Sequence, residues 1–98
     1  MEQLVLTPST QIAHIDIQLE DRDNYTGYRA ELRTRRGEDV LTLANLRRHR
    51  ASAGGYAVSF DIPSSALAAG GYELALKGVA EGRIVVDISY HYFGVLKQ

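Results

Sequence analysis

The sequence predicts an all-β fold, a single antiparallel β-sandwich of about seven strands. Three observations carry this prediction. Apolar and polar residues alternate with a period of two, helical periodicity is nearly absent, and turn-forming residues recur between the alternating segments. Such alternation is typical of antiparallel strands that turn one face to a core and the other to solvent.

The predicted strands follow one another along the whole chain. Leu4 and Leu6 indicate the first strand, which Thr7-Pro8-Ser9 ends. The segments whose alternation predicts the next five strands are 13–20, 28–33, 40–43, 56–62 and 72–77. Gly37 lies in the short connection after the 28–33 strand and favours a hairpin there. Breaks are expected at 20–27, 35–38, 44–55, 63–71 and 78–82.

The last predicted strand, 83–97, is long and irregular. Its apolar residues fall into two sets of opposite parity: Ile84, Val86 and Ile88 in the first, Phe93 and Val95 in the second. One extra residue reverses which face of a strand points inward. A β-bulge between Ile88 and Phe93 is therefore predicted.

A corner between two strands is the most specific feature of the chain. Pro63 ends one strand and favours one short helical turn, and Gly70-Gly71 permits the turn into the next strand, which opens on Tyr72. In immunoglobulin-like sandwiches, a tyrosine at this place bonds back to upstream backbone. Tyr72 is therefore predicted to be buried, with its hydroxyl bonded to the backbone near Leu67 or Ala68. The sandwich is expected to be of the immunoglobulin or fibronectin-type-III kind.

The inward parity of these strands also predicts the core. The predicted core residues are Leu6, Ile15, Ile17, Leu19, Tyr28, Leu32, Val58, Phe60, Leu67, Leu74, Leu76, Ile88 and Phe93.

Length and composition bound the kind of protein. Ninety-eight residues fit a single domain, 1–98, and a net charge of −1 provides no overall field that would attract nucleic acid or a membrane. The absence of cysteine excludes disulfides and thiolate chemistry. No apolar run approaches the ~18 residues of a membrane span. The chain is expected to be either cytoplasmic or part of something longer.

The charges are unevenly distributed along the chain. Residues 29–50 hold seven arginines against three carboxylates, whereas residues 1–28 hold five carboxylates against one arginine. Arg47, Arg48 and Arg50 form the densest basic run and could bind phosphates or another anionic partner. No aromatic residue is interleaved, which argues against nucleic acid, and the alternative is a solvated loop.

Acidic residues and histidines offer further candidate ligands. The loop 20–24 (EDRDN) gathers oxygen atoms that calcium prefers, but turn chemistry alone also accounts for Asp and Asn there. His14, His49 and His91 show no metal-ligand spacing, so structural roles are favoured. His91 shares the parity of Phe93 and is expected to be partly buried and hydrogen-bonded.

No pattern indicates an enzyme. No serine lies in a Gly-x-Ser-x-Gly elbow, and no pair of carboxylates stands isolated among apolar residues. We therefore expect no catalytic residue, no cofactor, no metal and no small-molecule substrate.

Tyr90 and Tyr92 are the candidate protein-binding residues of the last strand. Their parity points them outward, and exposed tyrosines provide large contact area at a small entropic cost. The alternative is cross-strand packing on the sheet face. If the last strand is an exposed edge, a second copy or a partner strand could add there.

The order of these motifs resembles a known family. The segments that carry the resemblance are 28–34 (YRAELRT), 56–63 (YAVSFDIP), 67–78 (LAAGGYELALKG) and 92–96 (YFGVL). Together they are similar to the C-terminal β-sandwich of bacterial membrane proteins of the anti-sigma-factor or zinc-finger type, over about residues 4–97. Gly94 and His91 depart from the pattern, so the resemblance leaves the register of the closing strand open.

The resemblance implies a location and a role. In that family, a cytoplasmic zinc-binding segment precedes one membrane helix, and the sandwich lies outside the membrane. The 98 residues would then be an extracytoplasmic domain that meets the membrane only through a segment absent from this chain. The expected function is a non-enzymatic interaction or sensing module with a protein partner or with self-association through an edge strand. The alternatives are an anion or nucleic-acid binder, and then a small enzyme.

Overall fold

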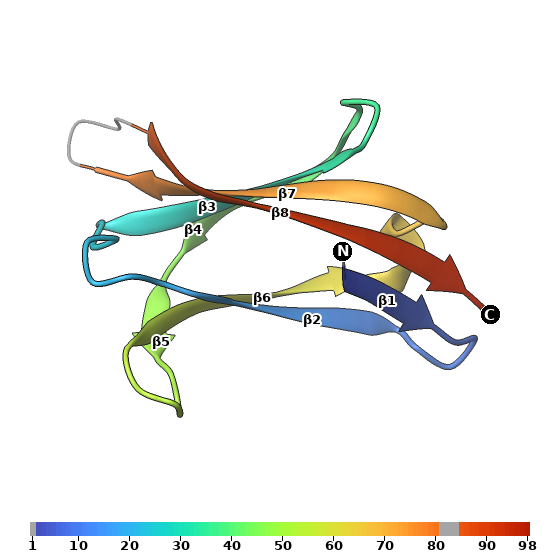
Figure 1. Ribbon diagram of the computed structural model, residues 1–98, viewed down its shortest axis with the longest axis horizontal. Coiled ribbons are helices and arrows are strands. Elements are labelled where there is room, and N and C mark those ends of the chain that lie inside the picture. The colour runs from blue at the N-terminus through green and yellow to red at the C-terminus, as the bar shows by residue number, and fades with distance from the viewer. Residues whose placement is uncertain (1, 81–84) are drawn as a thin grey trace.

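The computed structural model describes residues 2–80 and 85–98 and shows two β-sheets packed face to face (Figure 1). The described residues form eight strands and one short 3-10 helix, η1. Their bounds are β1 (Glu2–Leu6), β2 (Ile12–Gln18), β3 (Gly27–Thr34), β4 (Asp39–Leu46), β5 (Arg48–Arg50), β6 (Tyr56–Pro63), η1 (Ser64–Ala66), β7 (Gly70–Val79) and β8 (Val85–Lys97). The predicted all-β sandwich is confirmed.

The two sheets differ in size. The larger has the strand order β1-β8-β7-β3-β4, and the smaller has the order β2-β6-β5. All pairs are antiparallel except β1 with β8, which run parallel from Glu2↔Phe93 to Leu6↔Lys97. The prediction of a wholly antiparallel sandwich is corrected at this pair. The parallel pair is possible because β1 and β2 do not form a hairpin: the turn after Leu6 carries the chain from the larger sheet into β2 of the smaller one.

The eighth strand lies where the sequence predicted a break, at 44–55. β4 continues to Leu46, and β5 pairs with β6 from Arg48↔Val58 to Arg50↔Tyr56. The Arg-His-Arg segment contains no apolar residue, so the alternation of apolar and polar residues that marks the other strands is missing there. Arg48 and Arg50 are solvent-exposed, as the solvated-loop alternative expected, but they lie on an edge strand and not in a loop.

The predicted bulge in the last strand is confirmed, at the first residue of the expected interval. Leu76 pairs with Ser89 and Lys77 pairs with Asp87, so Ile88 is the extra residue of β8. Beyond the bulge, Phe93 shares the inward face of its partner Tyr72. The predicted strand residues 83 and 84 lie outside the described residues.

The core lies between the sheets and matches most of the expected set. Of the predicted core residues, Ile15 and Ile88 are only partly buried, and the others are buried. Ile15 belongs to an edge strand, which neighbouring side chains cover on one flank alone. The buried hydrophobic residues outside the predicted core set are Ala13, Ala30, Ala57, Ile62, Tyr72, Ala75 and Val95.

The predicted tyrosine corner is confirmed. Tyr72 is 3% exposed, and its hydroxyl donates to the carbonyl oxygen of Ala68 at 2.7 Å. Its ring stacks on Phe93 with centroids 5.6 Å apart. Gly70 has φ of +143°, a conformation that residues with a Cβ rarely adopt. Pro63 precedes η1, the short helical turn that the sequence predicted.

A second buried tyrosine ties down the loop before β3. Tyr28 is 1% exposed; its hydroxyl donates to the carbonyl oxygen of Asp23 at 2.5 Å and accepts from the Tyr25 amide at 3.3 Å. The Tyr25 ring lies against Gly78, where an added Cβ would come within 2.3 Å of ring carbon Cδ2. This second corner was not predicted, although Tyr28 was assigned to the core.

Candidate functional site

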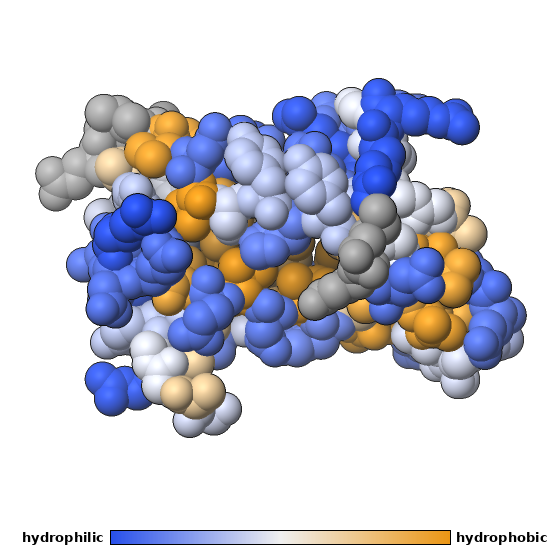
Figure 2. Space-filling model, viewed as in Figure 1, coloured by the Kyte–Doolittle hydropathy of each residue, from blue (hydrophilic) through white to orange (hydrophobic). Residues whose placement is uncertain are grey.

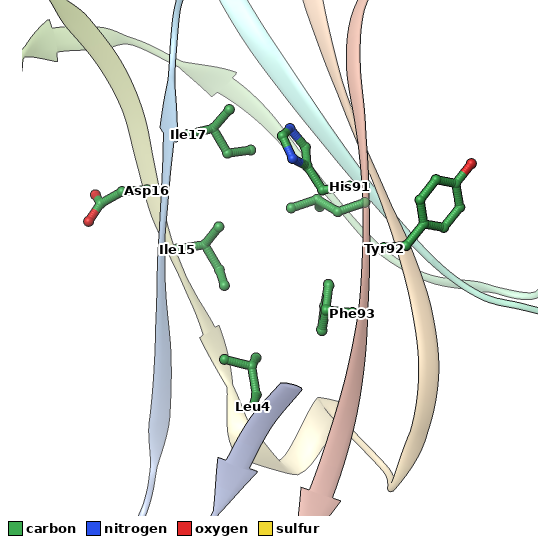
Figure 3. A pocket seen from close by; sticks show the side chains of 8 residues that line it. Leu4, Ile15, Asp16, Ile17, His91, Tyr92 and Phe93 are labelled. Atoms are coloured by element: carbon green, nitrogen blue, oxygen red, sulfur yellow. The ribbon is translucent and has the colours of Figure 1, made fainter. Parts of the chain in front are cut away.

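The outer face of the larger sheet displays both predicted tyrosines. Tyr92 pairs with Glu73, and Tyr90 pairs with Ala75, so both rings point away from the core. Tyr90 is 48% exposed and Tyr92 is 51% exposed. In Figure 3, the Tyr92 side chain points away from the space between the sheets. The predicted outward orientation is confirmed.

Charged neighbours hold these two rings. The Arg35 guanidinium lies 5.5 Å from the Tyr92 ring centroid, within the range of a cation–π contact. A hydrogen bond to the Asp87 carboxylate raises the pKa of the Tyr90 hydroxyl. The tyrosines therefore have defined partners while much of each ring stays accessible.

An ion-pair network continues from the tyrosines across β7 and β3. Glu31 is central, with a side chain 14% exposed, and its carboxylate lies 3.0 Å from Arg29 Nε and 3.3 Å from Lys77 Nζ. Lys77 also lies 3.7 Å from Asp87, next to Tyr90. We call the surface formed by Tyr90, Tyr92, Arg35, Glu73, Lys77 and Asp87 the tyrosine face.

The arginine run does not form one patch. Arg48 lies with its guanidinium 4.0 Å from the Tyr56 ring centroid, and that of Arg50 lies 5.8 Å from it. Hydrogen bonding to Arg50 lowers the pKa of Tyr56. Arg47, in the link between the sheets, instead lines a separate hollow beside Gly27 and Val79. The predicted phosphate contacts would therefore come from arginines on different surfaces.

The acidic loop lies beside one of these arginines. Arg48 and Tyr56 share a hollow of about 90 Å³ with residues of the 20–24 loop. Within the loop, Asp23 accepts a hydrogen bond from the Glu20 amide at 3.0 Å, and Arg22 pairs with Glu20 at 2.9 Å. The Asp23 carboxylate thus closes the turn, in keeping with the turn chemistry of the sequence.

A row of polar side chains crosses the outer face of the smaller sheet. It joins three strands and consists of His14, Asp16, His49, Ser59 and Asp61. His14 Nδ1 lies 2.6 Å from Asp61 Oδ1, and its Nε2 lies 3.1 Å from Asp16 Oδ1. This row was not predicted as a unit, because His14 and Asp61 become neighbours only through the β2–β6 register. Their outward parity was the one available signal.

The row contains serine, histidine and aspartate, but its hydrogen bonds differ from those of a catalytic triad. Ser59 donates to the Asp16 carboxylate, whereas a serine nucleophile gives its proton to a histidine. His49 Nε2 lies 2.5 Å from Ser59 Oγ, and its Nδ1 lies 3.2 Å from the carbonyl oxygen of Arg50.

The charges in the row shift two pKa values in opposite directions. The hydrogen bond to Asp61, aided by the nearby Asp16 carboxylate, raises the pKa of His14 above its ordinary 6.5. The hydrogen bond from Ser59 lowers the pKa of Asp16 below its ordinary 3.8. Both groups are solvent-exposed, so the row is a surface network.

A small apolar slot opens between the two sheets where β2 faces β8. It has a volume of about 110 Å³, and Ile15, Ile17 and Phe93 point into it while Asp16 points away (Figure 3). His91 shares this inward side and lies 2.9 Å from the Ser89 hydroxyl. It is exposed, which corrects the expected partial burial, because β1 pairs with β8 only from Phe93 onward.

Within residues 2–80 and 85–98, no three His, Cys, Asp or Glu side chains are placed so that they could hold a metal ion. No helix in those same ranges has the length and apolar character needed to cross a bilayer.

Comparisons of the chain with family models, with characterised proteins and with solved structures find no match. What the chain shows is an all-β fold of two sheets, and its function must be argued from its surfaces.

Proposed function

We propose that this domain is a non-enzymatic protein-interaction module that binds its partner through the tyrosine face. The observation that carries the proposal is the pair Tyr90 and Tyr92, each about half exposed and one above the other on the outer face of the larger sheet. Tyrosine and tryptophan supply much of the binding energy at protein interfaces. Exposed tyrosines on a rigid strand provide that contact area with little entropy to lose.

The surroundings of the tyrosines support a protein partner over a small molecule. The tyrosine face lies on hydrogen-bonded strands and includes both positive and negative charges. Arg35 lies beside Tyr92, and Asp87 lies beside Tyr90. Mixed charges around an aromatic centre favour one orientation of a complementary protein surface. The expected partner surface therefore has an apolar or aromatic centre flanked by acidic and basic groups.

The family resemblance extends this proposal to a cellular role. We place the domain outside the bacterial cytoplasm, as the sensing or interaction domain of a membrane-anchored regulator of the anti-sigma-factor type with an immunoglobulin-like sandwich. The motif through Tyr72, whose corner geometry matches the expectation, supports this assignment. Membrane attachment would use a segment outside these 98 residues.

Site-specific photo-crosslinking in cells that express the protein tests the proposal. A photoreactive phenylalanine analogue at position 92 should give one discrete protein adduct. The matched control carries the same group at Ala53, an exposed residue of the β5–β6 turn on the other sheet. Equal adducts at both positions, or none at position 92, would contradict the proposal.

A further inference from the structure

β2 is an edge strand, and no strand among the described residues pairs with it on the side away from β6. The Leu19 amide donates to Tyr56 and the Ser64 amide donates to Gln11, both at 2.9 Å. The ladder between these bonds has no register shift. Because bonding alternates along an antiparallel strand, the backbone groups of residues 12, 14, 16 and 18 point to the open side. Such a row is a template for another strand.

We propose that β2 pairs with β2 of a second copy of this chain, antiparallel, about a twofold axis through Ile15. This register places His14 opposite Asp16 of the second copy, and the symmetry repeats the pair. Within one copy, His14 already contacts the carboxylates of Asp16 and Asp61, so Asp16 of the second copy would join an existing histidine–carboxylate network. Directly opposite residues of unlike charge stabilise an antiparallel pair.

The neighbouring registers are disfavoured by the same two residues. An axis through His14 would set His14 opposite itself, and an axis through Asp16 would set two carboxylates opposite each other. An axis between residues would oppose inward and outward side chains, which an antiparallel ladder does not allow. Compared with an axis through His14 or Asp16, the order His14-Ile15-Asp16 therefore favours the axis through Ile15.

The surface beside β2 also favours an added strand. The apolar slot between the sheets opens at this edge, and apolar side chains show between the two sheets in the space-filling view (Figure 2). Ile15 of the second copy would meet Ile15 at the axis and extend the inward face over the slot. Ile12, 57% exposed, would lie opposite Gln18 at each end of the pairing.

Self-pairing would join the smaller sheets of two copies and leave both tyrosine faces accessible. The inference goes beyond the proposed function and does not depend on it, since its test requires no partner protein. A single strand pair buries less than a standard protein interface. We therefore expect a weak dimer that forms between micromolar and millimolar concentration.

Sedimentation equilibrium of designed charge variants tests the register. Ile12→Lys with Gln18→Lys sets lysine opposite lysine, and the dissociation constant should rise at least tenfold. Its matched control, Ile12→Lys with Gln18→Glu, sets lysine opposite glutamate and should dimerise as well as the native chain or better. The proposal would be overturned if the native chain stayed monomeric at millimolar concentration. It would also be overturned if the two charge variants had equal dissociation constants.

A disulfide cross-link tests the axis independently of charge. The chain lacks cysteine, so Ile15→Cys introduces one thiol, and two copies paired at Ile15 bring their Cα atoms to about 4.5 Å, within disulfide range. The control Gln18→Cys separates its two thiols by about 20 Å, six residues of strand. Oxidation should give covalent dimer for position 15 alone. Equal dimer at both positions, or none at position 15, would refute the axis.

Discussion

The hydroxyl of Tyr72 reaches back four residues to the carbonyl oxygen of Ala68, at 2.7 Å, across the corner that leads from the smaller sheet into the larger one. The bond satisfies a backbone acceptor where the chain changes sheets. Burial raises the pKa of this hydroxyl, so it remains a donor throughout the physiological pH range. The corner is thus a structural tie, and it leaves the binding role to other surfaces.

Removing this hydroxyl should weaken the fold without changing its shape. Tyr72→Phe keeps the ring stacked on Phe93 and deletes one hydrogen bond, which should cost about 0.5–1.5 kcal/mol in the free energy of unfolding. Chemical denaturation of the two proteins measures this difference. An unchanged denaturation midpoint would show that the bond contributes nothing.

Tyr28→Phe should cost more than Tyr72→Phe. The Tyr28 hydroxyl both donates to Asp23 and accepts from the Tyr25 amide, so its loss leaves two backbone groups without this partner. A loss of about 1–3 kcal/mol in unfolding free energy is expected. The same denaturation assay compares the variants, and the reverse order of costs would contradict a second corner.

Because Gly78 contacts the Tyr25 ring, substitutions at these two positions should have strongly non-additive effects on the free energy of unfolding. Gly78→Ala places a Cβ within 2.3 Å of that ring and should cost about 1–3 kcal/mol. In a Tyr25→Ala background, the ring is gone and the same change should cost much less. A double-mutant cycle of unfolding free energies measures the coupling; additive costs would mean that the two residues do not touch.

Stability should depend on pH through the polar row on the smaller sheet. The pKa of His14 is raised in the folded state, so its contribution is complete below about 6.5 and is lost as pH rises through the folded value. The pKa of Asp16 is lowered, so its contribution is present above about 3.8 and is lost as pH falls. His14→Gln should flatten the neutral-pH part of the profile. It should also weaken the acid part, because His14 helps Ser59 to lower the pKa of Asp16. NMR titration of the His14 ring should locate the shift, and a pKa for His14 at or below 6.5 would contradict it.

Much of the fold could be predicted because its strands alternate strictly. The corner at Tyr72 and the bulge at Ile88 followed from parity and turn chemistry. β5 could not be predicted, because Arg48 and Arg50 pack on Tyr56 through their guanidinium groups and add no apolar period. The parallel pairing of β1 depends on which sheet a short strand joins, and local sequence does not encode that choice.

Some of the candidate sites could be predicted from the sequence and others could not. The outward placement of Tyr90 and Tyr92 followed from strand parity, as soon as the bulge was located. The polar row of the smaller sheet brings together residues up to 47 positions apart, and this proximity depends on register rather than on spacing. The separation of Arg47 from Arg48 depends on the chain crossing between sheets at that point.

The most direct test of the tyrosine face is the dissociation constant of the partner captured by crosslinking, measured for the native domain, Tyr92→Ala and Arg48→Ala. We predict that Tyr92→Ala weakens binding at least tenfold, about 1.4 kcal/mol, while its melting temperature stays unchanged. Arg48→Ala, on the other sheet, should bind as the native domain does. Native affinity in Tyr92→Ala, or a loss confined to Arg48→Ala, would contradict the account.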